Sequence, residues 1–326
     1  MTFLSLIIPC YNVSEYLPAT LRSLTQLKDA EDCEFIFVND GSTDNTLLLL
    51  TDFAKKDKRA IIIDQKNQGV SAARNRALEI VQGRYILCLD GDDCLHANTM
   101  TIIKENIHDS DALLSPCIFQ KNGKNKMQDI HITNGIYSIE QLYKSCSVFP
   151  TAPMLVYSST IIQRNQLQFS TNLKSGEVYD FTINYMQYVD TIYVLNFPIF
   201  NYFQRFDSAV HRLNYKNDLT VVDAIESIYK NGKNLLNFSS FSQTAFLLFK
   251  GFIYTKYLKS STLENEMLCA INYSLSNRTI KRCVINIAFK SHSCRNRFLA
   301  IYLILLPNCF GFKLLKKLYS LKMNLN

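Results

Sequence analysis

The sequence lacks the patterns that define several common protein classes. Its 10 cysteines include no Cys-x-x-Cys pair, and Cys10, Cys88 and Cys117 lie in apolar runs. They indicate buried thiols in a reducing compartment, and they give no support for a disulfide framework or a zinc site. The 5 histidines are scattered along the chain, so no histidine metal cluster is expected. No internal repeat or low-complexity tract is visible.

Targeting and membrane-spanning signals are also missing. Residues 3–8 are apolar, but no basic residue precedes them and Pro9 follows, so they predict a first strand and not a signal peptide. The apolar run at residues 298–306 stops at Pro307, well short of the roughly 20 residues of a spanning helix. We therefore expect a cytoplasmic protein. At 326 residues and 48% hydrophobic, the chain is long enough to bury a full core.

Acidic residues are absent from the end of the chain. No Asp or Glu follows Glu266, whereas ten Lys and Arg residues do. The net charge of the whole chain is +7, so the net charge of the residues up to Glu266 is −3. Between residues 310 and 322, aromatic and leucine residues alternate with lysines, which suits a helix on an anionic lipid surface. We expect peripheral association with the inner face of the cell membrane; a core helix with a basic solvated face is the alternative. Nucleic-acid binding is not expected, because long aliphatic residues separate the cations.

The first half of the chain alternates strand and helix patterns. Apolar runs predict strands at residues 4–9, 34–39, 60–64 and 85–90. Helices are predicted from about residue 14, over 44–56 and over 70–81, with Ser14 and Asp44 as N-terminal caps. This alternation predicts an α/β fold with a mostly parallel twisted sheet flanked by helices. We place that domain at residues 1–212 and a mainly helical, basic region at residues 213–326.

Three carboxylates follow the last of these strands. Asp90, Asp92 and Asp93 surround Gly91 where the apolar run ends. Because that run is apolar on both faces, the acids can leave the core only at the carboxyl end of the strand, where open α/β sheets bind ligands. Hard cations take oxygen ligands and are usually completed by substrate phosphates. The cluster predicts a site for Mg²⁺ or Mn²⁺; a solvated acidic turn is the alternative.

Polar residues also follow the other predicted strands. Tyr11 and Asn12 come after the first strand, where an aromatic ring can stack on a base, and Asp40 ends the second, where it can accept hydrogen bonds from a base or ribose. Gly69 begins the third helix close to the sheet, and Arg74 on that helix can pair with a carboxylate of the site or with a phosphate. Each residue alone also fits a structural role, but their recurrence at successive strand ends indicates one nucleotide site.

Together these segments resemble the family 2 glycosyltransferases. The matching segments are residues 5–12 (Ser-Leu-Ile-Ile-Pro-Cys-Tyr-Asn), 38–44 (Val-Asn-Asp-Gly-Ser-Thr-Asp), 69–75 (Gly-Val-Ser-Ala-Ala-Arg-Asn) and 90–93 (Asp-Gly-Asp-Asp), in the family's order and spacing. The resemblance implies the GT-A fold and an inverting transfer from a nucleotide-diphospho-sugar, with a UDP-sugar favoured, to a hydroxyl of a glycan or lipid-linked glycan. It implies metal ligation by Asp92, with Asp90 and Asp93 beside it. The substrate-binding residues it implies are Pro9, Tyr11, Asn12, Asp40, Gly69, Arg74, Asp90 and Gly91.

An inverting transfer also needs a carboxylate that accepts the proton of the attacking hydroxyl. The family usually carries this base in a Glu-Asp pair followed by an aromatic residue, and the matching residues 177–181 are Glu-Val-Tyr-Asp-Phe. Val178 stands where that Asp is expected, and valine cannot accept a proton. If a helix begins near Gly176, Glu177 and Asp180 share one face. We predict Glu177 as the base, with Asp180 second; both also fit acids favoured at a helix N-terminus.

A last polar stretch, residues 202–212, resembles the family's segment behind the acceptor helix. Arg205 or Arg212 would close over the diphosphate and His211 would add a metal ligand; a polar loop without a ligand role is the alternative. Two hypotheses remain. One is an active transferase of cell-surface polysaccharide biosynthesis, and the other is a catalytically degenerate nucleotide-sugar-binding or scaffold protein, suggested by Val178. The sequence identifies neither the sugar nor the acceptor.

Overall fold

The chain divides into two compact units. One unit comprises Met1–Thr171 and Phe181–Arg205, and the other comprises Asn172–Asp180 and Phe206–Asn326. The structure, a computed structural model, describes residues 1–121, 124–127, 130, 132–145, 154–203, 215–232, 242, 245, 246, 248, 273–290 and 299–300. The predicted boundary after residue 212 stays a prediction, because residues 204–214 lie outside these ranges.

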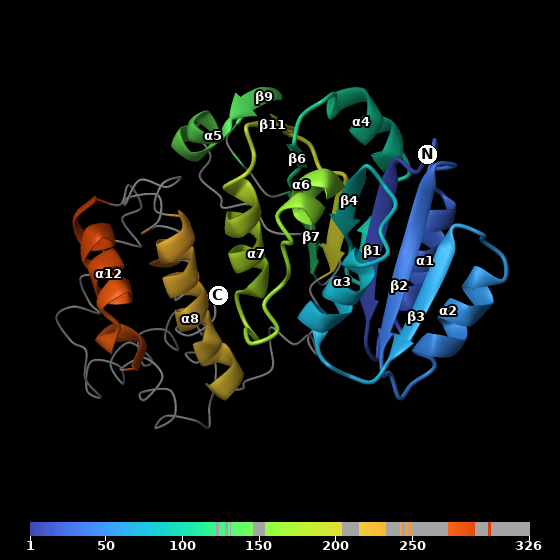
Figure 1. Cartoon of the computed structure of the whole chain (residues 1–326), viewed down its shortest axis with the longest axis horizontal. Helices are drawn as coiled ribbons and strands as arrows, with labels where there is room; N and C mark the ends of the chain where they lie inside the picture. The colour runs from blue at the N-terminus through green and yellow to red at the C-terminus, as the bar shows by residue number, and fades with distance from the viewer. Residues whose placement is uncertain are drawn as a thin grey trace. The chain divides into compact units, whose positions relative to one another are not determined.

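The first unit begins with four parallel strands, β1 (Leu4–Cys10), β2 (Cys33–Asp40), β3 (Ala60–Gln65) and β4 (Tyr85–Cys88). All residues of β2 and β4 are buried, as expected of parallel strands that are covered on both faces. The later strands of the same sheet are β6 (Ala112–Leu114), β9 (Gly135–Ser138), β10 (Leu155–Ser158) and β11 (Thr191–Val194). The strand order is β3-β2-β1-β4-β10-β6-β11-β9. Figure 1 shows β3, β2, β1 and β4 side by side. This mixed sheet confirms the predicted α/β class.

Helices connect the parallel strands in the predicted alternation. They are α1 (Leu17–Thr25), α2 (Thr46–Ala54) and α3 (Val70–Leu78). The later helices are α4 (Thr99–Asn106), α5 (Ile139–Ser145), α6 (Ser159–Arg164) and α7 (Glu177–Met186). A second sheet contains β5 (Cys94–Leu95), β12 (Phe200–Phe203), β7 (Ile118–Lys121) and β8 (Lys124–Met127), in the order β5-β12-β7-β8. Since β5 begins one residue after Asp93, this small sheet borders the acidic turn.

The predicted start of the first helix is wrong. The helix begins at Leu17, with Pro18 in its first turn, because the fixed φ of proline suits the first helical residues. Ser14 does not cap it; instead the Ser14 N–H donates to Asp44 Oδ2 at 3.0 Å. Asp44 does serve the start of α2, since its Oδ1 accepts the Thr46 N–H at 3.0 Å, although the N-cap position itself is Asn45. Asp44 therefore holds the loops after β1 and β2 together.

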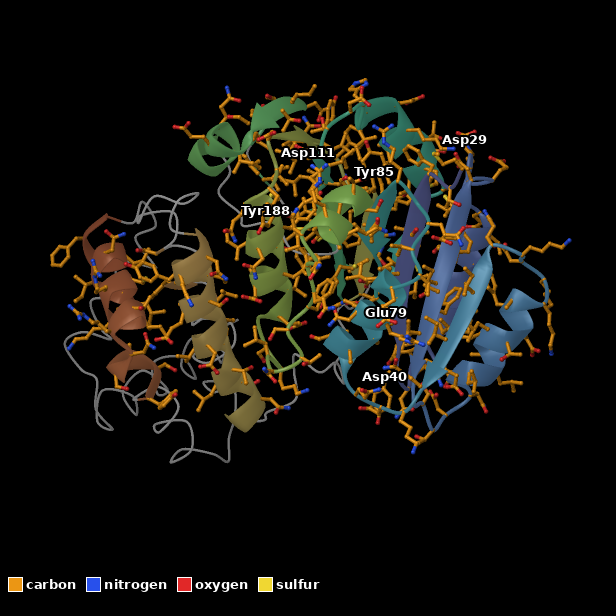
Figure 2. All side chains as sticks on the ribbon, in the orientation of Figure 1. Asp29, Asp40, Glu79, Tyr85, Asp111 and Tyr188 are labelled. Atoms are coloured by element: carbon orange, nitrogen blue, oxygen red, sulfur yellow. The ribbon has the colours of Figure 1, made fainter. Side chains whose placement is uncertain are left out.

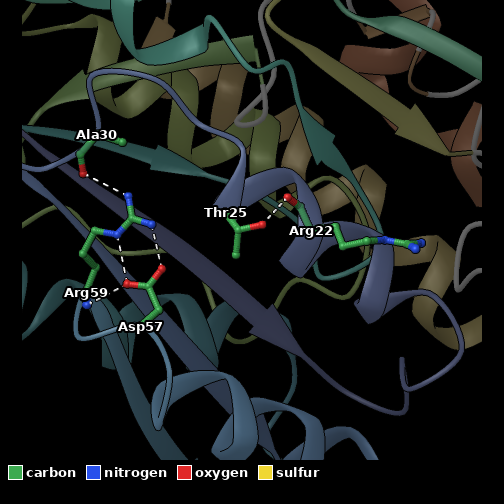
Figure 3. Close-up of polar contacts among 5 residues, drawn as sticks. All are labelled: Arg22, Thr25, Ala30, Asp57 and Arg59. Carbon is green, nitrogen blue, oxygen red and sulfur yellow. Dashed lines mark hydrogen bonds and ion pairs between the residues drawn. The ribbon is translucent and has the colours of Figure 1, made fainter.

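The amino-terminal end of the parallel sheet is closed by structural contacts. Arg59 donates to both carboxylate oxygens of Asp57, at 2.9 and 2.6 Å, and to the Ala30 carbonyl at 3.1 Å (Figure 3). Hydrogen bonds from Arg59 lower the pKa of the Asp57 carboxyl. In the same figure, Thr25 Oγ1 near the end of α1 donates to the Arg22 carbonyl at 2.8 Å. These contacts fasten the turns that enter β2 and β3, and leave the opposite end of the sheet for polar loops.

The second unit is mainly helical in its described residues. Helix α8 (Tyr215–Gly232) and helix α12 (Arg278–Lys290) contact each other. Both helices bury apolar residues, among them Val221 and Ile225 in α8 and Ile280 and Val284 in α12. This agrees with the prediction of a mainly helical region. Among the residues that the structure describes, no helix is both long and apolar enough to cross a membrane.

Candidate functional site

The candidate site lies where the parallel strands end. Strand β1 is paired in register with β2, so that Cys10 lies opposite Asn39, and with β4, so that Ile7 lies opposite Cys88. The residues that follow these strands therefore share one edge of the sheet. Figure 2 shows Asp40 at this edge and Asp29 at the opposite end of the sheet. The sequence prediction that the strand ends converge is confirmed.

Asp90, Asp92 and Asp93 form an acidic cluster at this edge. One carboxylate oxygen from each lies within 4.8 Å of the others. Asp90 and Asp92 are half-buried, and Asp93 is fully buried. The turn is tight, because the Asp93 N–H donates to the Asp90 carbonyl at 3.0 Å. Three converging oxygen donors, two of them partly open to solvent, fit a hard divalent cation.

Gly91 allows this turn to lie against the first strand. A Cβ at this position would come within 3.0 Å of Cys10 Sγ and 3.2 Å of the Pro9 carbonyl oxygen. Thr20 of α1 also fixes the turn, since its Oγ1 donates to the Gly91 carbonyl at 3.0 Å. A side chain at residue 91 would therefore require Cys10, Pro9 or the turn itself to shift by a few tenths of an ångström.

The cluster places a negative field on its neighbours. Burial raises the pKa of the Cys10 thiol, and the charges of Asp92 and Asp90 raise it further. Burial and then the Asp93 charge raise the pKa of Cys94 to about 11. Burial raises the pKa of Tyr202 in β12, with additional contributions from all three acids. A cation bound among these carboxylates would relieve this repulsion.

Arg74 pairs with the cluster from α3. Its Nη2 lies 2.9 Å from Asp90 Oδ1, and the Arg74 side chain is 4% exposed, against 34% for Asp90. The guanidinium also lies over the Phe169 ring, 5.2 Å from its centroid, and Phe169 stacks on Phe181 with centroids 3.9 Å apart. The sequence predicted either a carboxylate of the site or a phosphate as the partner of Arg74, and the structure places it against the Asp90 carboxylate. The stack behind it had no signal in the sequence.

Asp93 has a second contact that sequence reasoning missed. Its Oδ1 accepts the N–H of Phe203, the last residue of β12, at 2.9 Å. Strand β12 also pairs with β5, where Asn201 lies opposite Cys94. Asp93 therefore fastens the acidic turn to the second sheet. This contact joins residues 110 apart in the chain, so no local pattern could have indicated it.

Asp40 is buried and engaged with the loop before α3. Its Oδ1 accepts from Gln65 Nε2 and the Gln68 N–H, at 2.8 and 2.9 Å, and its Oδ2 accepts the Gly69 N–H at 2.8 Å. A carboxylate offers about four acceptor positions, which leaves room for one more partner. Gly69 has a φ of 94°, a conformation that favours glycine. The predicted contact of Asp40 with a base or ribose stays a prediction.

The loops after β1 and β2 are tied by side chains. Asn12 adopts a left-handed φ of 50°, and its Oδ1 accepts the Thr43 N–H at 2.8 Å, while its own N–H donates to Ser42 Oγ at 3.1 Å. Tyr11, beside it, is 49% exposed, and Pro9 is half-buried. Asn12 thus holds the loop that presents the Tyr11 ring.

The predicted acids of residues 177–181 lie in the second unit. A helix does begin here, since α7 starts at Glu177 after Gly176, whose φ is 86°. Asp180 is buried and accepts a hydrogen bond from Ser227 of α8. Burial raises the pKa of its carboxyl, although the Ser227 hydrogen bond partly offsets this. Glu177, in contrast, is half-buried.

Several predicted residues lie outside the described part of the chain. They are Arg205, His211, Arg212 and the basic aromatic segment at residues 310–322.

Comparisons with known proteins agree with this architecture. The family model described as "Glycosyl transferase family 2" matches residues 5–168, about half of the chain. Among solved structures, S. aureus TarS 1-349 in complex with UDP-GlcNAc is similar at a TM-score of 0.74 and 19% identity, covering 98% of this chain and 92% of that one. This likeness shows the same fold.

Two curated relatives are named for enzymes of polyol-phosphate polymers. A teichoic acid poly(glycerol phosphate) polymerase of Staphylococcus epidermidis is 28% identical over 73% of this chain and 34% of its own length. A poly(ribitol-phosphate) beta-glucosyltransferase of Bacillus spizizenii is 30% identical over 56% of this chain and 29% of its own length. The chain thus spans about a third of the length of these relatives. On the evidence of the matched residues and the sheet with its acidic turn, the chain belongs to glycosyl transferase family 2.

Proposed function

We propose that the protein transfers a sugar from a nucleotide-diphospho-sugar, with a UDP-sugar favoured, to a hydroxyl of a glycan or lipid-linked glycan, with inversion at the anomeric carbon. The observation that carries the proposal is the acidic cluster at the carboxyl edge of the sheet, paired through Asp90 with Arg74. An edge of this kind is where open α/β sheets bind nucleotides.

The donor diphosphate would be held at the acidic turn. Asp92 and Asp90 are the partly open carboxylates and would hold Mg²⁺ or Mn²⁺, which as a Lewis acid would neutralise charge on the leaving diphosphate. Arg74 orients Asp90, and the exposed ring of Tyr11 offers a stacking surface for the base. Asp93 keeps the turn in place from β12.

Glu177 is the proposed base. Glu177 is half-buried and therefore partly accessible to solvent, whereas Asp180 is buried and bonded to Ser227. The carboxylate of Glu177 would take the hydroxyl proton as the oxygen attacks the anomeric carbon, and the bond from that carbon to the diphosphate would break. This supports Glu177 over Asp180.

The names of the relatives point to an acceptor class. The names of the two relatives described above contain poly(glycerol phosphate) and poly(ribitol-phosphate), which are polymers of polyol phosphates. We therefore propose a cell-surface glycan or polyol-phosphate polymer, lipid-linked during its synthesis, as the acceptor. The basic aromatic segment at residues 310–322, outside the described residues, would meet the membrane surface that carries such an acceptor.

The direct test is sugar transfer or donor hydrolysis with a panel of UDP-sugars and Mn²⁺. Asp92→Ala should lower turnover at least about a hundredfold, because electrostatic stabilisation of the leaving group is lost. Asp52→Ala, an exposed acid of α2 that pairs with Lys55, is the matched control and should keep full turnover. Unchanged turnover in Asp92→Ala would remove the cation from the proposal.

A nucleotide-sugar-binding protein without turnover is the second candidate, favoured only by Val178. Substitution of the proposed catalytic base distinguishes the two candidates. Glu177→Gln should abolish transfer in an active enzyme, whereas Asp180→Asn, which keeps an acceptor for Ser227, should not. Donor binding without turnover, with turnover gained in Val178→Asp, would establish the second candidate.

A further inference from the structure

Helix α12 carries an outward stripe of basic and apolar residues. Arg278, Lys281, Arg282, Ile285 and Phe289 are all exposed, and Phe289 is 75% exposed and Ile285 39%. At 100° per residue these five positions fall within about one third of the helix circumference. The amino-terminal half of this stripe is cationic and the carboxyl-terminal half is apolar.

The opposite side of the same helix faces the core of the second unit. The buried residues there are Ile280, Cys283, Val284, Ile287 and Ala288. The helix start is fixed as well: Asn277 Oδ1 accepts the N–H groups of Thr279 and Ile280, at 2.9 and 3.1 Å. Asn277 Nδ2 in turn donates to Glu226 of α8 at 2.6 Å. Among the residues that the structure describes, the buried face of α12 is the one that packs, and the outward stripe stays exposed.

The charge of the stripe selects an anionic partner. No acidic residue occurs in α12, and none follows Glu266 in the chain. The acid that the structure places at the helix start, Glu226, accepts a hydrogen bond from Asn277. Arg and Lys side chains at this surface would therefore attract phosphate groups.

The apolar half of the stripe decides which anionic partner fits. A polyol-phosphate polymer would pair with the cations but would leave the Phe289 ring and the Ile285 side chain in water. An anionic lipid surface offers both environments, with phosphate headgroups for Arg278 and Lys281 and the acyl boundary for Phe289 and Ile285. We propose that the outward face of α12, made of Arg278, Lys281, Ile285 and Phe289, docks on an anionic lipid bilayer.

The purpose of this docking, to bring the enzyme to a lipid-linked acceptor, rests on the proposed function. The docking itself does not. Its binding is measured without turnover. The test is co-sedimentation of the full chain with phosphatidylcholine vesicles that contain phosphatidylglycerol, against vesicles of phosphatidylcholine alone. The full chain should sediment with the anionic vesicles, and added salt should weaken this binding.

Two variants separate the two halves of the stripe. Arg278→Gln with Lys281→Gln should weaken partition to anionic vesicles roughly twenty-five-fold, at about fivefold for each basic residue. Ile285→Ser with Phe289→Ser should weaken it about tenfold, because less apolar area enters the lipid. The matched control is Leu48→Ser with Lys56→Gln and Lys58→Gln, all on or just after α2, where Leu48 is 58% exposed. This control should bind as the unmodified chain does.

Circular dichroism should show unchanged helix content in every variant, since all the substituted side chains are exposed. Vesicle binding that is unchanged in the Ile285→Ser and Phe289→Ser variant would overturn the proposal. So would binding of linear polyphosphate that depends on Arg278 and Lys281 while anionic vesicles do not bind, because the face would then hold a polymer. Vesicle binding without any sugar transfer would refute the proposed function and leave the docking face standing.

Discussion

At the residue scale, the three clustered carboxylates differ in their surroundings although they are close in sequence. Asp90 is bonded to Arg74, Asp93 is fully buried and bonded to the backbone of β12, and Asp92 is half-buried. Phe203 is half-buried, and its backbone N–H has the Asp93 carboxylate as its acceptor. Asp93 therefore acts first as a positioning residue, and Asp92 is the residue best placed to hold a cation.

Substitutions at Asp93 should separate these roles. Asp93→Asn keeps an oxygen acceptor for the Phe203 N–H and should retain the stability of the protein, whereas Asp93→Ala leaves that group unpaired and should cost about 1–3 kcal/mol of unfolding free energy. Urea denaturation measures this difference.

The same variants report on the cation. Asp93→Asn should keep most of the Mn²⁺-dependent turnover, and Asp92→Asn should lose it. If the two Asn variants lost Mn²⁺ dependence equally, Asp93 would be a ligand and not a positioning residue.

At the element scale, the sequence predicted the first four strands well because burial on both faces leaves a largely apolar pattern. Every residue of β2 is buried, and its central residues 35–38 are all apolar. Shared strand ends then follow from the topology. The start of α1 was wrong because Ser14 serves the neighbouring loop through Asp44. That tie depends on two loops 30 residues apart, and so does the contact of Asn12 with Ser42. Local patterns do not contain such contacts.

The tie at Asp44 predicts a pH dependence of stability. Burial acts to raise the pKa of its carboxyl, but hydrogen bonds from Thr46 and Ser14 outweigh this and lower the pKa from 3.8 to about 2. Because the folded pKa is depressed, the stabilisation is present above about pH 4 and is lost as the pH falls from there towards about pH 2. Asp44 is exposed, so solvent screening limits the effect to under about 1 kcal/mol.

Urea denaturation at pH 3 and pH 5 tests this expectation. Asp44→Asn should lose part of the difference in unfolding free energy between the two pH values. Asp52→Asn, an exposed acid of α2, is the control and should retain the difference. If Asp44→Asn kept the same difference in unfolding free energy between pH 3 and pH 5 as the unmodified chain, the carboxylate charge would not hold the two loops.

At the scale of the whole molecule, the two units carry different parts of the proposed chemistry. The first unit contains the acidic cluster, Arg74 and the loops of Tyr11 and Asp40, and the second contains Glu177 and α12. A donor bound at the acidic cluster therefore stabilises the first unit whether or not the base is competent. Binding and turnover can thus be separated in one protein.

Donor binding should appear as a thermal shift. A nucleotide diphosphate such as UDP with Mn²⁺, at about 100 times its dissociation constant, should stabilise the folded state by about 2.7 kcal/mol. Asp92→Ala should remove the Mn²⁺-dependent part of the shift, because the cation would lose a carboxylate ligand. Glu177→Gln should keep the shift in full while it loses turnover, since the base contributes to the reaction and not to donor binding. An equal Mn²⁺-dependent shift in Asp92→Ala would mean that the diphosphate binds away from the acidic cluster.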